Sequence, residues 1–457
     1  MAAVTFTRRH FLETTALAGA AWCLPSDPAA WWQAGRPRPT AAQLAWQRDE
    51  LAMFIHFGVN TFSDHEWGDG KELPSSFAPS KLDARQWARA AKQAGFRAMI
   101  LTAKHHDGFC LWPTRTTTHS VAASPFRGGA GDVVREFVDA CRAEGLAPGL
   151  YLSPWDRNHP AYGDSDAYNN VYIAQLTELL TSYGKLSEVW FDGANGEGPN
   201  GRRQVYDWPR VWATVKRLQP DAVVFSDAGP DVRWGGNESG VAGDPNWSTV
   251  DPARVPVPGV SGPGIIDALQ HGDRDGTVWR PAESDTSIRP GWFYHQAEDS
   301  RVKTAEQLAT LYLRSVGRNS KLLLNVPPTP EGLLHDTDIA RLNGMHELLR
   351  GWFAAVAMNR ETVSLAGRVR EVTLTRPSPV ALIRLNEAIA RGQHIARYKT
   401  EGFDGAQWIE LSRGTTVGFA KIDRVTVPTV VQRVRVTVEE TAGSANPSVR
   451  VNVYPPA

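Results

Sequence analysis

The segment VWFDGANG, residues 189–196, places Asp192 at the end of an apolar run and directly before a glycine. A short apolar run of this kind predicts a strand that is buried on both faces, and the glycines predict the turn that follows it. Chemistry in α/β proteins is concentrated at the carboxyl ends of such strands. Asp192 is therefore a candidate catalytic or ligand-binding carboxylate.

Polar side chains also stand at the ends of three other apolar runs. Alternate residues of a barrel strand face the interior, which places His56 of MFIHFG and Tyr151 of GLYLS on the inward-facing positions. The segment KHHDG closes another run with His105 and His106. We expect one mouth of a barrel to collect Asp192, His56, Tyr151 and one or both of His105 and His106.

Two kinds of chemistry suit an aspartate among histidines and aromatic side chains. Asp192 and the histidines could hold a divalent metal that activates water for hydrolysis. The chain has no H-x-H or H-E-x-x-H spacing, and neighbouring side chains such as those of His105 and His106 tend to diverge, which disfavours a metal centre. Alternatively, Asp192 is one of two carboxylates that cleave a glycosidic bond, which lie about 5–5.5 Å apart in retaining enzymes.

The second carboxylate of such a pair should come from a loop that reaches the leaving group. The candidates are Glu197, Glu238 and Glu283. Glu197 is too close to Asp192 along the chain to oppose it, whereas Glu238 lies in the long segment VRWGGNESGVAGDPNW, whose glycines allow the loop to bend. Trp234 in that segment could lower the local polarity and raise the pKa of the acid. Glu238 is the favoured candidate and Glu283 stays open.

Strand-like and helix-like segments alternate over most of the chain, which predicts a parallel sheet. Because no glycine-rich phosphate loop follows the first strand, the pattern favours a (β/α)8-like barrel over an open doubly wound sheet. We expect this barrel in residues 31–355. The predicted strands lie at 51–60, 96–109, 146–155, 189–196, 221–229, 291–295 and 320–328.

The pattern changes after Arg360, where Val- and Thr-rich runs alternate with a period of two residues. Gly, Asn and Pro separate these runs. This is typical of a small antiparallel β-sandwich, which we expect in residues 356–457.

The charges of the 457 residues balance, with 49 basic and 49 acidic side chains and no basic block. This makes nucleic acid and an anionic membrane poor candidate partners. The 17 tryptophans are a mild indication of a sugar ligand, because aromatic faces suit sugar rings.

The N-terminus carries TRRHFL before a short, mildly apolar run and small residues near Ala29 and Ala30. This pattern predicts a twin-arginine signal peptide in residues 1–30 and a periplasmic or secreted protein, with no membrane contact after removal of the signal. The apolar run is too short for a permanent membrane span.

The chain resembles the α-L-fucosidases of glycoside hydrolase family 29 over roughly residues 40–350. The motifs that carry the resemblance are MFIHFGVNTF, HEW, LTAKHHDGFCLW, GLYLSPWD, VWFDG, GNESG, and SDTSIRPGWFYH followed by LLLNVPP. It implies a bacterial retaining exo-α-L-fucosidase with a barrel and a C-terminal β-sandwich, and with no metal or organic cofactor. The implied partner is a fucosylated oligosaccharide or glycan, and the oligomeric state is left open.

The resemblance also assigns roles. Asp192 matches the nucleophile, and Glu238 matches the acid/base of the branch that prefers fucose linked α-1,3 or α-1,4, which favours Glu238 over Glu283. The residues that match substrate-binding positions are His56, Glu66, Trp67, His105, His106, Tyr151 and Trp292. The alternative is a non-catalytic fucose-binding or other carbohydrate-binding protein, which would bind fucose without turnover.

Overall fold

The computed structural model describes residues 35–354, 358–363, 367–443 and 447–456. The signal peptide predicted in residues 1–30 lies outside these ranges. Within them, no helix has both the length and the apolar character that a membrane span requires.

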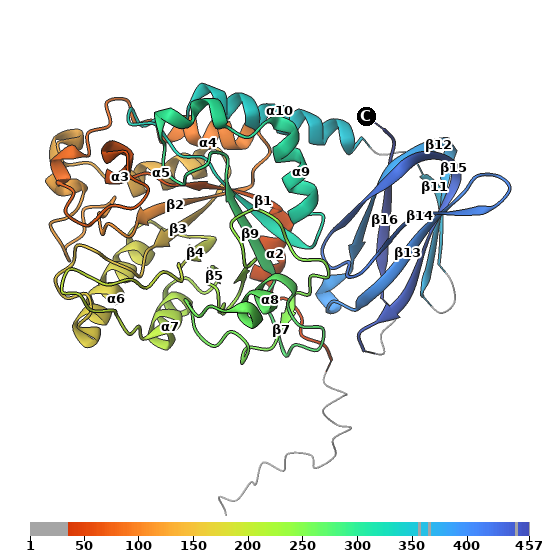
Figure 1. Cartoon of the computed structure of the whole chain (residues 1–457), viewed down its shortest axis with the longest axis horizontal. Coiled ribbons are helices and arrows are strands. Elements are labelled where there is room, and N and C mark those ends of the chain that lie inside the picture. The colour runs from red at the N-terminus through yellow and green to blue at the C-terminus, as the bar shows by residue number, and fades with distance from the viewer. Residues whose placement is uncertain (1–34, 355–357, 364–366, 444–446, 457) are drawn as a thin grey trace, which may run out of the picture. The chain divides into compact units, whose positions relative to one another are not determined.

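Eight parallel strands form the sheet at the centre of the N-terminal part (Figure 1). Most residues of strands β1 and β2 are apolar, and every residue of both strands is buried, as expected for a sheet covered on both faces. The order of the strands is β5-β4-β3-β2-β1-β10-β9-β6. Their bounds are β1 Leu51–Ile55, β2 Ala98–Lys104, β3 Ala147–Leu152, β4 Glu188–Trp190, β5 Val223–Phe225, β6 Arg233–Trp234, β9 Ala282–Ser287 and β10 Ser320–Asn325.

The sheet closes into a barrel through a narrow contact. The two edge strands are β5 and β6, and a single parallel bridge joins Phe225, the last residue of β5, to Val232, which directly precedes β6. A cluster of buried side chains from the strands fills the interior, including Phe54, Tyr151 and Trp190. The predicted (β/α)8-like barrel is confirmed.

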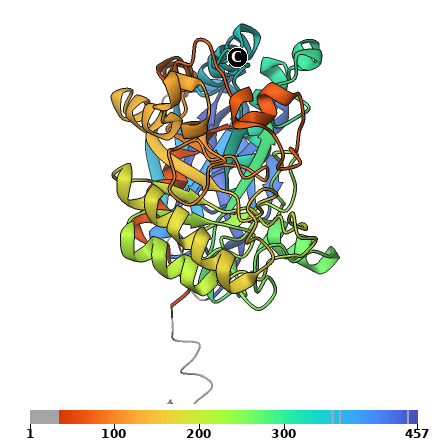
Figure 2. The ribbon, with the colours of Figure 1, turned by 90° about the vertical axis from the view of Figure 1, so that its left-hand side faces the viewer.

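Helices surround the barrel sheet (Figure 2). Their buried faces pack on the outer side of the strands in one large hydrophobic cluster. Several begin at an aspartate whose side chain accepts a backbone N–H of the first turn, as Asp83, Asp132 and Asp207 do. The α-helices are α2 Ala41–Asp49, α3 Val59–Ser63, α4 Ala84–Gln93, α5 Val133–Ala143, α6 Ser165–Ser182, α7 Trp208–Leu218, α8 Pro263–His271, α9 Ala305–Ser315 and α10 Asp336–Trp352.

Short elements lie between the main helices and strands of both parts of the chain. Strands β7 Thr249–Val250 and β8 Val278–Trp279 pair as an antiparallel ribbon. The 3₁₀ turns are η1 Pro74–Ser76, η2 Val121–Ala123, η3 Phe126–Gly129, η4 Gln296–Arg301 and η5 Ile389–Arg391.

One predicted strand is wrong. Residues 291–295 form bends rather than a strand, and the strand of this region is β9, immediately before them. The sequence of β9, AESDTS, is polar although all six residues are buried, because their partners are other polar groups of the barrel interior. An apolar pattern therefore could not identify it.

The C-terminal part is an antiparallel sheet of six strands. Strands β12 and β15 are long and pair with each other in two stretches separated by register shifts, so that their halves form two layers over a core of Val, Leu and Ile side chains. This confirms the predicted β-sandwich. The bounds are β11 Met358–Val363, β12 Val369–Glu387, β13 Ile395–Phe403, β14 Trp408–Gly414, β15 Lys421–Thr441 and β16 Val449–Tyr454.

Candidate active site

A pocket of about 460 Å³ opens where the carboxyl ends of the barrel strands meet. Every site residue predicted from the sequence lines it except Tyr151, and both His105 and His106 take part. The lining residues are Phe54, His56, Glu66, Trp67, His105, His106, Trp190, Asp192, Ala194, Glu238, Asp285, Pro290 and Trp292.

Asp192 follows β4 and is held through both carboxylate oxygens. The backbone N–H of Ala194 donates to Oδ1 at 2.6 Å, and the Tyr151 hydroxyl donates to Oδ2 at 3.3 Å. The Tyr151 ring is buried in the barrel interior, so its hydroxyl reaches the carboxylate from below the pocket. Tyr151 therefore orients Asp192 in the structure.

The three histidines of the pocket are buried, which lowers their pKa values and keeps the rings neutral at pH 7. The pKa of His56 falls to about 3. Its Nδ1 lies 2.9 Å from Oδ1 of Asn325, an acceptor, so Nδ1 carries the proton and Nε2 is left as an acceptor. A neutral ring of this kind can accept a hydrogen bond from a substrate hydroxyl.

His106 is oriented in the same way by Ser153. The Ser153 hydroxyl donates to the carbonyl of Trp155 at 2.7 Å, so it accepts from His106 Nδ1, which is also 2.7 Å away. The unprotonated Nε2 of His106 lies 4.0 Å from Oδ2 of Asp192. Because the ring is neutral, His106 does not form a charged ion pair with Asp192.

Glu66 fixes the segment that carries Trp292. Its carboxylate accepts the backbone N–H groups of Trp292 and Phe293, and Nε2 of His295 lies 3.0 Å from Oε2. Trp292 lines the pocket beside His56, with ring centroids 5.2 Å apart. One carboxylate thus ties the loop after β9 to the loop after β1.

Glu238 reaches the pocket from the loop that follows β6. Gly236 and Gly240 flank it with φ angles of +75° and +70°, a left-handed conformation that glycine adopts without strain. Partial burial raises the pKa of Glu238, a hydrogen bond with the Trp292 side chain opposes this effect, and repulsion from Asp192 adds to it. Glu238 nevertheless stays partly exposed to solvent, which suits a group that exchanges protons.

Glu283 lies elsewhere, within the barrel. Its side chain is fully buried, accepts a hydrogen bond from Trp190 Nε1 at 3.0 Å and is absent from the pocket lining. Burial and the nearby Glu188 raise its pKa, against the attraction of Lys321. The structure thus places Glu283 below the pocket floor.

Asp285 is a pocket residue that the sequence reasoning missed. It lies two positions after Glu283 on β9 and therefore on the same face of the strand. Trp234 Nε1 donates to its Oδ1 at 2.8 Å. Burial and repulsion from Glu238 raise the pKa of Asp285 to about 8, so the carboxyl group is neutral at pH 7. The sequence signal for Asp285 was its spacing of two residues from Glu283, because residues two apart in a strand share a face.

We expect Asp285→Asn to stabilise the protein more at pH 8 than at pH 5. The folded state holds a proton on Asp285 up to a pKa of about 8, whereas an unfolded aspartate loses it near pH ~3.9. Stability therefore falls as the pH rises between these values, and asparagine removes that loss. By scanning calorimetry, the melting temperature of the variant relative to wild type should rise by about 2–4 °C between pH 5 and pH 8. A difference independent of pH would contradict the raised pKa.

Among the residues that the structure describes, no group of three or more His, Cys, Asp or Glu side chains is arranged to hold a metal ion. The pocket instead holds four carboxyl groups, those of Glu66, Asp192, Glu238 and Asp285, among histidine and aromatic side chains at the mouth of a (β/α)8-like barrel. This combination of fold and site defines the class of glycoside hydrolases.

The comparisons with known proteins identify the family. The family model for α-L-fucosidases matches residues 46–351, more than half of the chain. The chain therefore belongs to the α-L-fucosidase family, glycoside hydrolase family 29. α-L-Fucosidase 1 of Arabidopsis thaliana is 50% identical over 319 residues, which cover 70% of this chain and 61% of that protein. The chain thus spans about three fifths of that relative.

Solved structures agree with this membership. A glycoside hydrolase 29 family member from an unknown rumen bacterium is 40% identical with a TM-score of 0.85, covering 93% of this chain and 78% of that one. A Ruminococcus gnavus family 29 fucosidase in complex with fucose is 30% identical with a TM-score of 0.79, covering 93% and 97%. Both matches include the barrel and most of the remaining chain.

Proposed function

We propose that this protein is a retaining exo-α-L-fucosidase that releases L-fucose from α-1,3- or α-1,4-fucosylated glycans. The observation that carries the proposal is the shared pocket of Asp192 and Glu238, in which Asp192 is fixed by hydrogen bonds and Glu238 is exposed on a bent loop. The fucose-bound relative supports fucose as the sugar that enters the pocket.

Each carboxyl group has a separate task in this mechanism. Asp192 attacks the anomeric carbon while Glu238 gives its proton to the departing glycosidic oxygen, which leaves a fucosyl ester on Asp192 and an ionised Glu238. Glu238 then takes a proton from the water that cleaves the ester, so both groups return to their starting states. Two inversions give net retention.

The rest of the pocket suits a deoxy sugar. The unprotonated Nε2 atoms of His56 and His106 can accept hydrogen bonds from hydroxyl groups, as inferred above. Phe54, Trp190 and Trp292 provide apolar surface for the C5 methyl group that distinguishes fucose.

Two further parts of the proposal rest on the sequence. The GNESG loop around Glu238 supports the α-1,3/1,4 preference, and the TRRHFL segment supports twin-arginine export to the periplasm or the medium from a bacterial cell. Glu238 rather than Glu283 is the proposed acid/base, since Glu283 has no access to the pocket lining.

Hydrolysis of two substrates tests the function. Purified protein without residues 1–30 should release fucose from a Lewis-type trisaccharide faster than from an aryl α-L-fucoside, and NMR should show the α-anomer first. Cleavage of the aryl fucoside alone would contradict the linkage preference. A β-anomer formed first would contradict retention, and binding of fucose without turnover would indicate a carbohydrate-binding protein.

A further inference from the structure

The loop that carries Glu238 is closed at its base by a buried contact. Arg233 of β6 and Asn246 are 13 residues apart in the chain, and Nη2 of Arg233 donates to Oδ1 of Asn246 at 2.8 Å. Both side chains are buried, and Glu238 lies between them along the chain. We call residues 233–246 the acid loop. The position of Glu238 depends on what holds the two ends of this loop.

The barrel holds the acid loop as far as Ala242. The Trp234 side chain and the backbone N–H of Gly240 both donate to Asp285 of β9, the first to Oδ1 at 2.8 Å and the second to the carbonyl at 3.0 Å. The backbone N–H of Ala242 then donates to the carbonyl of Arg314 in α9 at 3.0 Å. The remaining residues of the acid loop lead to contacts outside the barrel.

Asn246, at the end of the acid loop, joins the barrel to the sandwich. On the barrel side, its Nδ2 donates to the carbonyl of Arg318 at 2.8 Å. On the sandwich side, its backbone N–H donates to the Thr416 hydroxyl at 2.8 Å, and its carbonyl accepts from Nε2 of Gln393 at 3.1 Å. Thr416 and Gln393 are buried, so loss of either partner leaves a backbone group of Asn246 unsatisfied.

An ion pair adds a second link two residues earlier. Asp244 Oδ2 lies 2.6 Å from Nζ of Lys421, the first residue of β15, and the Thr415 hydroxyl donates to Oδ1 of the same carboxylate. The Lys421 side chain is only 6% exposed, so salt screens this pair less than it screens a surface pair. Two residues of the acid loop, Asp244 and Asn246, are therefore fixed by side chains of the sandwich.

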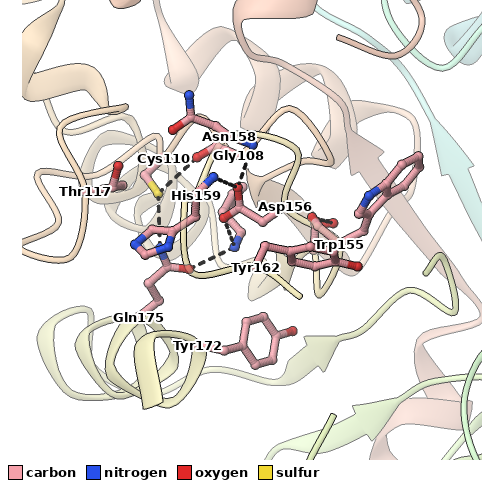
Figure 3. Close-up of polar contacts among 12 residues, drawn as sticks. Gly108, Cys110, Thr117, Trp155, Asp156, Asn158, His159, Tyr162, Tyr172 and Gln175 are labelled. Atoms are coloured by element: carbon pink, nitrogen blue, oxygen red, sulfur yellow. Dashed lines mark hydrogen bonds and ion pairs between the residues drawn. The ribbon is translucent and has the colours of Figure 1, made fainter. Parts of the chain in front are cut away.

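The histidine side of the pocket is held without the sandwich (Figure 3). Lys104, the last residue of β2, directly precedes the two pocket histidines, and its Nζ lies 3.0 Å from Oδ2 of Asp156. Asp156 Oδ1 accepts the backbone N–H groups of Asn158 and His159 at 3.1 and 2.8 Å. All residues labelled in Figure 3 belong to the barrel. A change in the sandwich should therefore reach Glu238 without displacing the histidines.

We propose that the C-terminal sandwich positions the acid/base Glu238 by holding the end of the acid loop through Thr416, Gln393 and Lys421. None of these three residues lines the pocket, so they act through the loop rather than on the substrate. The inference rests on the proposed function, in which Glu238 protonates the leaving group. A loop held at both ends is ordered before substrate binds, and a misplacement of about 1 Å can cost ~10²-fold in rate.

The test compares two leaving groups that differ in their need for an acid. For wild type, Thr416→Val and Lys421→Met, kcat/KM is measured with a Lewis-type trisaccharide, whose sugar alkoxide needs a proton, and with α-L-fucosyl fluoride, whose fluoride ion needs little help. Because kcat/KM covers the steps up to the fucosyl ester, the later role of Glu238 as base does not enter. The trisaccharide-to-fluoride ratio should fall about tenfold in each variant, part of the ~10²–10⁴-fold that a general acid contributes.

Matched variants separate this role from a general loosening of the fold. Thr416→Ser keeps the hydroxyl and should keep the wild-type ratio. Arg384→Met breaks the ion pair that links β12 of the sandwich to Glu50 of the barrel, which does not involve the acid loop, and should also leave the ratio unchanged. In a Glu238→Gln background, Thr416→Val should lower the ratio no further, because the acid through which it acts is already absent.

The outcomes separate this inference from the function on which it rests. An unchanged ratio in Thr416→Val and Lys421→Met, an equal fall in Arg384→Met, or a further fall in the Glu238→Gln background would overturn the positioning role while wild-type turnover kept the fucosidase. If one of the two sandwich variants does not fold, the ratio in the other decides. Absence of a leaving-group effect in Glu238→Gln itself, or of wild-type turnover of fucosyl fluoride, would overturn both the inference and the proposed function.

Discussion

Replacement of Asp192 by glycine is expected to reduce kcat for fucoside hydrolysis by about 10⁴-fold or more, the range found when a catalytic nucleophile is removed. Without the carboxylate, no ester can form at the anomeric carbon, and the hydroxyl of Tyr151 and the N–H of Ala194 lose their shared acceptor. The measurement is kcat with the aryl α-L-fucoside at saturating substrate.

A small anion separates loss of the nucleophile from loss of the fold. Azide can enter the space left by the side chain and attack from the same face, so Asp192→Gly should regain turnover in azide and form β-L-fucosyl azide, the product of one inversion. The matched control is Glu197→Gln, which neutralises an exposed carboxylate in the same segment and should keep wild-type activity. Wild-type activity in Asp192→Gly would contradict the assignment of Asp192 as nucleophile.

Replacement of Glu238 by glutamine is expected to lower kcat/KM with the trisaccharide by about 10²–10⁴-fold, the usual contribution of a general acid. A sugar alkoxide leaves poorly without a proton, whereas fluoride ion needs little help. The loss with fucosyl fluoride should therefore be smaller, and the two losses are measured side by side.

The pH profile gives the same assignment a second test. An acid works only in its protonated form, so wild-type kcat/KM should fall as the pH rises through the pKa of Glu238, which burial and Asp192 raise above its ordinary value. Glu238→Gln should lack this alkaline decrease. Glu283→Gln serves as the comparison. Because Glu283 is buried away from the leaving group, its replacement should change kcat/KM by the same factor for both substrates. A larger loss with the trisaccharide than with fucosyl fluoride in Glu283→Gln, but not in Glu238→Gln, would identify Glu283 as the acid/base instead of Glu238.

The barrel could be predicted where its strands are apolar and could not where they are polar. The runs that became β1, β2 and β10 consist largely of Leu, Ile, Met and Ala, and their burial follows from composition. Strand β9 could not be predicted because it is polar. Its buried residues Glu283 and Asp285 accept hydrogen bonds from Trp190 and Trp234, which are distant in sequence. Strand β6, with two residues, is too short to show any period.

The same distinction applies to the site. The positions of His56 and Asp192 follow from the parity of strand ends, because alternation within one strand fixes which side chains face inward. The resemblance supplied Glu66, Trp67 and Trp292. The support of Asp192 by Tyr151 and the raised pKa of Asp285 depend on distances between strands, and one strand's sequence does not contain them.

The narrow closure of the barrel bears on how substrate range changes during evolution. Strands β4, β5 and β6 have only three, three and two residues, and the carboxylates of Asp192 and Glu238 come from the segments that follow the first and the last of them. Residues 241–277 lie outside the eight-stranded sheet and can therefore vary in length without shifting its register. A lineage of such barrels can acquire a new glycan by exchanging one loop together with its acid, while the nucleophile stays in place.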